Sequence, residues 1–135
     1  EAAAILNLPD DAGMTRLELI SRIDGEPAAY LEIYFPPEVG RELEQHDFVT
    51  AGVPIIRAVE RRLNVRVARA QQRIESGVAG KVAAAHLGLR PADPVLLVTR
   101  AYHLASGQPI EVVFVRYHPA RYSYVIEFNA DGRAG

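Results

Sequence analysis

Helix-like and strand-like patterns of apolar residues alternate along this chain. One stripe at i, i+3, i+4, i+7 and i+8 runs from Ala79 to Leu87 and predicts an amphipathic helix. Gly88 follows the stripe and is expected to end that helix in the left-handed conformation. A further helix is predicted to start near Pro54, because proline is tolerated in the first helical turn. Its expected buried face consists of Ile55, Ile56, Val59 and Leu63.

The strand patterns surround two turns that contain glycine. Asp24-Gly25 separates strands predicted at 17–23 and 28–35, and Ser106-Gly107 separates strands predicted at 95–104 and 110–117. Residues 65–75 predict another strand, in which a shift of the apolar phase after Val67 indicates a bulge. Residues 122–128 place large apolar side chains at every second position and predict a last strand that closes the sheet. Residues 129–135 are polar and small and are expected to form a tail.

The two halves of the sequence resemble each other at a spacing of about 80 residues. The word Ala2-Ala3-Ala4-Ile5-Leu6-Asn7-Leu8 returns as Ala83-Ala84-Ala85-His86-Leu87-Gly88-Leu89, and Asp24-Gly25-Glu26-Pro27 returns as Ser106-Gly107-Gln108-Pro109. Each copy predicts a helix end, a strand, a hairpin and a second strand. The chain is therefore expected to be an internally duplicated α+β domain, with helices on a largely antiparallel sheet of six or seven strands.

Composition and charge narrow the classes of function. The 135 residues suit one domain with a sizeable core, and the net charge of −2 argues against DNA binding by this chain alone. The absence of cysteine fits a reducing cytoplasm, and no apolar run is long enough to span a membrane. Residues 1–6 resemble the last turns of a helix without an N-cap, so we expect further residues upstream.

The sequence lacks the standard catalytic and metal-binding motifs. The sequence contains none of the G-x-S-x-G, H-E-x-x-H, P-loop or G-x-G-x-x-G patterns, and its four histidines lack ligand spacing. We therefore predict no catalytic residue, no metal site and no cofactor.

One pair of charged residues is a better candidate for a binding site. If Ser106-Gly107 centres the second hairpin, Tyr102 faces Glu111 and Arg100 faces Val113 on the same side of the sheet. A carboxylate and a guanidinium on an otherwise apolar face suit a small polar ligand. The alternative interpretation is a structural ion pair without a ligand.

Several words in fixed order give the chain a family resemblance. They are Ala84-Ala85-His86-Leu87-Gly88-Leu89, Pro94-Val95-Leu96-Leu97-Val98-Thr99-Arg100, Gly107-Gln108-Pro109-Ile110-Glu111 and Arg116-Tyr117-His118-Pro119-Ala120-Arg121-Tyr122. With them, residues 2–128 resemble the UTRA domain, the effector-binding domain of HutC-type GntR transcription regulators. The resemblance implies a chorismate lyase-like fold over residues 1–128, a small-molecule effector, a homodimer and no enzyme activity. It also implies an upstream winged helix-turn-helix domain, absent from this chain, that binds operator DNA.

The resemblance also carries over individual binding positions. Glu111 matches an effector-contacting glutamate of phosphosugar-sensing members, Tyr117 matches an aromatic residue near the same pocket, and Arg22 aligns with an arginine only if the turn has lost one residue. Those members have arginines, a glutamate and a serine at positions occupied here by Leu19, Ser21, Leu31 and Pro54.

The helix start can still offer the N–H groups of Ile55 and Ile56 to an anion. A doubly charged phosphate would have lost several partners, so the resemblance favours an organic acid over a sugar phosphate. Two other interpretations stay open: a lyase acting on a small aromatic acid with the same fold, and a dimerisation module without a ligand.

Overall fold

The computed structural model describes residues 1–48 and 54–130 of the chain. Its strands are β1 (Thr15–Ile23), β2 (Glu26–Phe35), β3 (Val67–Val78), β4 (Pro94–Leu104) and β5 (Pro109–Tyr117). Its helices are α1 (Ala2–Ile5), α2 (Pro37–Gly40), the 3-10 helix η1 (Gln45–Phe48), α3 (Ile55–Leu63) and α4 (Gly80–Leu87). No helix within the described ranges is long and apolar enough to cross a membrane.

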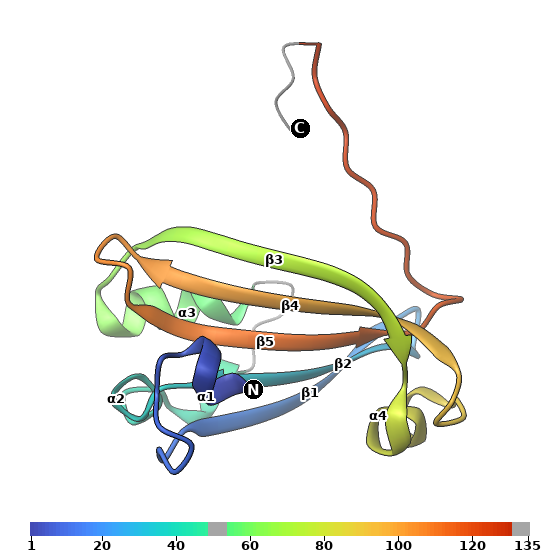
Figure 1. Ribbon diagram of the computed structural model, residues 1–135, viewed down its shortest axis with the longest axis horizontal. Helices are drawn as coiled ribbons and strands as arrows, with labels where there is room; N and C mark the ends of the chain where they lie inside the picture. Colours follow the sequence, from blue (N-terminus) through green and yellow to red (C-terminus); the bar gives the residue numbers. More distant parts are fainter. Residues whose placement is uncertain (49–53, 131–135) are drawn as a thin grey trace.

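The strands form one antiparallel sheet in the order β1-β2-β5-β4-β3. Helices cover both faces: α2, η1 and α3 pack on one face, which we call the inner face, while α1 and α4 pack on the other, the outer face. Figure 1 shows α1 in front of the sheet and α3 behind it, both toward the left, and α4 at the right-hand end of the sheet.

The duplication read from the sequence is present in the elements themselves. α1-β1-β2 and α4-β4-β5 follow the same order, and a left-handed residue follows each helix: Asn7, two residues after α1, with φ 58°, and Gly88, directly after α4, with φ 70°. The two copies meet where β2 pairs with β5, with Leu31 opposite Val115. The repeat therefore builds one continuous sheet rather than two separate units.

Turn residues and β-bulges together set the register of both hairpins, because the pairing shifts between Ser21 and Arg22 and between Tyr102 and His103. Asp24 and Gly25 both have positive φ, 51° and 80°, which confirms the type I′ turn expected between β1 and β2. In the second hairpin Tyr102 lies opposite Glu111, as expected from the sequence. The predicted bulge at the start of β3 is confirmed by a register shift between Val67 and Arg69.

The inner face carries the main hydrophobic core. Ile55, Ile56 and Val59 of α3 pack with Ile33 of β2 and Val113 of β5, all buried. α3 begins one residue later than predicted, because Pro54 is its N-cap with extended ψ of 142°. Its amphipathic face therefore lies over the middle of the sheet, where it forms one wall of the cavity described below.

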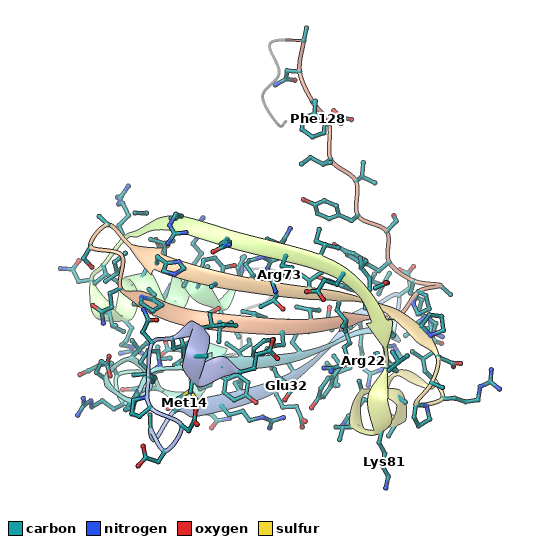
Figure 2. All side chains as sticks on the ribbon, viewed as in Figure 1. Met14, Arg22, Glu32, Arg73, Lys81 and Phe128 are labelled. Atoms are coloured by element: carbon teal, nitrogen blue, oxygen red, sulfur yellow. The ribbon has the colours of Figure 1, made fainter. Side chains whose placement is uncertain are left out.

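The prediction of a sixth or seventh strand was wrong for the part of the chain that the structure describes. Residues 122–128 are extended but do not join the sheet, and Val125 and Phe128 remain 78% and 68% exposed. Figures 1 and 2 show this segment, with Phe128 labelled, leading away from the body of the domain. Apolar alternation identified an extended segment but not a pairing partner. The predicted tail at 129–135 lies outside the described residues from 131 onward.

Candidate ligand-binding site

A cavity of about 310 Å³ lies between the inner face and the start of α3. Its lining comes from β1, β2, β4, β5 and the start of α3, which the pairing of the strands and the packing of α3 bring together. The lining residues are Leu19, Ser21, Leu31, Ile33, Pro54, Ile55, Ile56, Arg100, Tyr102, Glu111 and Val113. The volume falls at the lower end of the range for small-molecule sites, and an apolar wall with a few polar groups is typical of them.

The structure brings together five of the seven residues suggested as ligand contacts. They are Ile55, Ile56, Arg100, Tyr102 and Glu111, which come from three different elements. The four positions at which phosphosugar-sensing relatives were expected to differ also line the cavity. They are Leu19, Ser21, Leu31 and Pro54.

Arg22 and Tyr117 are not among the lining residues. Arg22 is exposed and donates from Nη1 to the carbonyl of Gly25 at 3.3 Å, so it closes its own hairpin. In Figure 2 it lies toward α4, at the end of the sheet remote from α3. Tyr117 is on the inner face, but its ring stacks on Tyr122 with a centroid separation of 3.6 Å.

Arg100 is held in place by a residue that sequence reasoning did not identify. Its Nε and Nη2 both donate to Oε1 of Gln72, at 2.8 and 2.6 Å. Gln72 lies directly opposite Arg100 in the β3–β4 ladder. Burial lowers the pKa of Arg100, but its electrostatic interactions with Tyr102 and Tyr117 raise the pKa by more, so the guanidinium stays charged. Gln72 could have been found from the sequence only if the register between β3 and β4 were known. No short turn joins these two strands, so the sequence does not give that register.

Glu111 is the most unusual group of the cavity. Its side chain is 2% exposed, and Oε1 has no hydrogen-bond partner within residues 1–48 and 54–130. Burial raises the pKa of Glu111 to about 8, although the charge of Arg100 acts in the opposite direction. At neutral pH the carboxyl group is therefore mostly protonated. A buried polar atom without a partner is costly, so its retention in a cavity points to a ligand.

The start of α3 adds a second polar feature to the cavity. The first N–H groups of a helix have no intrahelical acceptor, and Pro54 at the N-cap offers no side-chain cap to α3. Ile55 and Ile56 supply these N–H groups and also line the cavity. Together with the helix dipole they favour a negatively charged group at this end.

The outer face has hollows as well, and ion pairs line the one between α1 and the sheet. The hollow of about 480 Å³ is lined by Glu32, Tyr34, Phe114 and Arg116 among others. Glu32 accepts from Arg16 at 2.9 Å and forms an ion pair with Arg116 at 3.6 Å. Arg116 Nε is also buried without a hydrogen-bond partner among the described residues, but the Arg116 guanidinium is already paired with Glu32. The inner cavity, whose buried carboxyl group has no hydrogen-bonded cation, is therefore the stronger candidate.

Comparison with known families gives a match over most of the chain. The model of the UTRA domain matches residues 1–123. The match therefore covers all ten helices and strands given above, and it ends within the exposed C-terminal segment.

Two curated relatives are similar in sequence. The HTH-type transcriptional regulator Rv0792c of Mycobacterium tuberculosis is 36% identical over 106 residues, which cover 78% of this chain and 39% of the relative. The HTH-type transcriptional regulator YydK of Bacillus subtilis is 22% identical over 134 residues, covering 96% of this chain and 54% of the relative. This chain thus spans about half the length of these relatives, or less.

Solved structures share the fold. The ligand-binding domain of a GntR-family regulator from Bordetella bronchiseptica superposes with a TM-score of 0.81 at 22% identity, covering 94% of this chain and 80% of that one. A transcriptional regulator from Streptomyces coelicolor superposes with a TM-score of 0.79 at 27% identity, covering 90% and 78%. The fold found here is therefore that of known regulator domains.

Proposed function

This chain belongs to the UTRA domain family, and from that premise we propose that it is the ligand-sensing and dimerisation domain of a bacterial transcriptional regulator. In this proposal the full-length protein is a cytoplasmic GntR-family regulator of the HutC subfamily, with a chorismate lyase-like sensor domain. A small-molecule effector binds the sensor and changes the DNA affinity of an upstream winged helix-turn-helix domain. Two curated relatives, both longer than this chain, are named as HTH-type transcriptional regulators, which supports this arrangement and does not favour the lyase.

The observation that carries the proposal is Glu111 in the inner cavity. A core position normally holds an apolar residue, yet Glu111 is buried near the start of β5, next to Ile110 and Val112. Its Oε1 has no hydrogen-bond partner among the described residues, and the side chain borders a cavity large enough for a small metabolite. In a purely structural ion pair, the N–H donors of the cationic side chain would satisfy the carboxylate. Neither an Oε1 atom without a partner nor an adjoining cavity would then be expected.

The composition of the cavity supports an organic acid rather than a sugar phosphate. Leu19, Leu31 and Pro54 make its walls apolar, and Arg100 is the single cationic side chain among the lining residues. A dianionic phosphate needs several donors to offset its desolvation, whereas a singly charged carboxylate needs fewer. A flat apolar body then fits between Leu31 and Val113.

Unpaired edges of the sheet support a homodimer. β1 and β3 are the outer strands of the five-stranded order, so each presents one unpaired edge within the described part of the chain. The exposed apolar residues of the extended segment, Tyr124, Val125, Ile126 and Phe128, are a second surface that association would bury. We expect sedimentation at tens of micromolar to show a dimer, and a variant ending at Arg121 to dissociate more readily. A monomer under these conditions contradicts the dimer.

A thermal-shift screen of metabolites tests the sensor function directly. A ligand at about 100 times its Kd adds about 2.7 kcal/mol to the free energy of unfolding, which is easily detected as a rise in melting temperature. Organic acids, including urocanate, and hexosamine phosphates form the two arms of the screen. Leu31→Arg, which should fill the cavity, serves as the ligand-blind control. A protein that responds to no small molecule refutes the sensor function, and a response to sugar phosphates alone refutes the preference for organic acids.

A further inference from the structure

Almost every polar group that faces the inner cavity can donate a hydrogen bond. The guanidinium of Arg100 and the first N–H groups of α3 are donors only, and the hydroxyl groups of Ser21 and Tyr102 can donate or accept. Glu111 is the one carboxyl group of the lining. An ionised carboxylate at this place would repel the kind of ligand that all the other groups attract.

The geometry resolves this conflict in favour of a neutral Glu111. Arg100 directs Nε and Nη2 toward Gln72, so these donors are not available to neutralise Glu111. Glu111 is 2% exposed, so water can solvate a charge there only poorly. Without solvation or a hydrogen-bonded partner, a buried carboxyl retains its proton and becomes a donor itself.

We propose that Glu111 binds the effector as a neutral carboxylic acid, donating a hydrogen bond to the carboxylate of an organic anion that Arg100 and the N–H groups of Ile55 and Ile56 also attract. This inference rests on the proposed function, because it concerns the same cavity. It adds that the complex retains a proton between two carboxyl groups, so effector binding is coupled to pH. Ionisation of Glu111 would place two negative charges side by side and expel the ligand.

Few other groups can contribute to such a pH dependence. From β4, Arg100 and Tyr102 face Glu111, and the pKa of Arg100 is raised, so its charge does not change between about pH 6 and pH 9. Among the lining residues, β1, β2 and α3 contribute apolar side chains, backbone N–H groups and the hydroxyl group of Ser21. None of these groups titrates in this interval. Burial raises the pKa of Glu111 to about 8, which places its titration inside this window.

The expected change in affinity follows from proton linkage. Below pH 8 the free protein already holds the proton, so the Kd of an organic anion is nearly constant. Above pH 8 the proton must be taken up again on binding, and the Kd is expected to rise about tenfold between about pH 6.5 and about pH 9. A rise in Kd with pH distinguishes an organic anion from a cationic ligand. A cationic ligand bound by an ionised Glu111 would instead gain affinity over the same pH interval.

Calorimetric titration with trans-cinnamate tests this inference. Cinnamate is a flat carboxylate without a second titrating group, and cinnamamide and phenethylammonium are its neutral and cationic counterparts. For the unaltered protein we expect the Kd of cinnamate to rise about tenfold between about pH 6.5 and about pH 9, whereas for Glu111→Gln the two values should agree within about twofold. Tyr102→Phe, measured in parallel, should keep the tenfold ratio. Cinnamate binding that is equally tight at both pH values in the unaltered protein overturns the inference, as does preferential binding of phenethylammonium.

A measurement without ligand separates this inference from the proposed function. The carboxyl carbon-13 resonance of Glu111, assigned by comparison with Glu111→Gln, should titrate with a midpoint near pH 8 in the free protein. A midpoint below about pH 5.5 overturns the neutral acid whatever ligand the cavity holds. Binding of glucosamine 6-phosphate but not of cinnamate overturns the carboxylate ligand and leaves a small-molecule sensor. Failure of cinnamate to bind at either pH overturns this inference, and the sensor function itself is refuted only if the metabolite screen described above also finds no ligand.

Discussion

Replacing Glu111 by glutamine should remove a loss of stability that the unaltered protein suffers as the pH rises. Glutamine has nearly the same shape as a protonated glutamate but cannot ionise. Glu111 is 2% exposed and its burial raises the pKa from 4.5 to about 8. In the unfolded chain the same carboxyl group is solvated and has its ordinary pKa.

The magnitude follows from the protons bound in the two states. Between pH 4.5 and pH 8 the folded protein keeps a proton on Glu111 that the unfolded chain has released. The contribution of Glu111 is therefore most favourable below pH 4.5 and is lost as the pH rises through 8, by about 1.4 kcal/mol per pH unit within the interval. From about pH 5.5 to about pH 7.5 the free energy of unfolding should fall by about 2.5 kcal/mol on account of this one group.

Urea unfolding of both proteins at a series of pH values measures the effect. The difference between the two unfolding free energies is the useful quantity, because other titrating groups affect both proteins equally. His103 and His118, whose pKa values are lowered mainly by burial, act in the opposite direction and cancel in this difference. Glu42→Gln, at an exposed position, is the matched control. We expect Glu111→Gln to gain about 2.5 kcal/mol relative to the unaltered protein over these two pH units, and Glu42→Gln to gain almost nothing.

A constant difference between Glu111→Gln and the unaltered protein across this range would refute the reasoning. It would mean that Glu111 is ionised in the folded state, with its charge matched by a partner. Arg100 would then have to release Gln72 and turn toward Glu111, and Gln72→Ala would be nearly silent.

Three further predictions concern other parts of the fold. Asp47 is 1% exposed and accepts hydrogen bonds from Arg62 and from the backbone N–H of Glu44. Asp47→Ala should therefore lower the free energy of unfolding, measured in urea, by about 2–3 kcal/mol. A loss below about 0.5 kcal/mol would show that solvent replaces these bonds. Gly88 has φ 70°, so Gly88→Ala should cost about 1 kcal/mol in the same assay, and an unchanged midpoint would show that the cap relaxes without strain. This chain alone, with net charge −2, should not retard operator DNA in a gel at moderate salt, and tight sequence-dependent retardation would contradict the assignment of DNA binding to an upstream domain.

The sequence predicted the relative positions of those cavity residues that lie within one hairpin. Gly107 has φ 93° in the turn between β4 and β5, and Tyr102 lies opposite Glu111 as predicted. A register shift between Tyr102 and His103, which was not predicted, contributes to this pairing. The position of Ile55 and Ile56 at the start of α3 was also predicted, because Pro54 marks that start. Gln72 was missed because β3 and β4 are separated by α4, and no turn signal specifies which of their residues meet.

The sequence by itself determined the elements of this protein and their duplication. Alternation, helical spacing and turn residues act over a few positions, and they placed both hairpins, α3 and α4, and the left-handed ends at Asn7 and Gly88. Only the tertiary structure decided that β2 pairs with β5, that α3 covers the inner face and that residues 122–128 leave the sheet. Those outcomes depend on contacts between residues far apart in the chain. The burial that makes Glu111 an acid at neutral pH is one of them, since desolvation is a property of the assembled core and not of a short stretch of sequence.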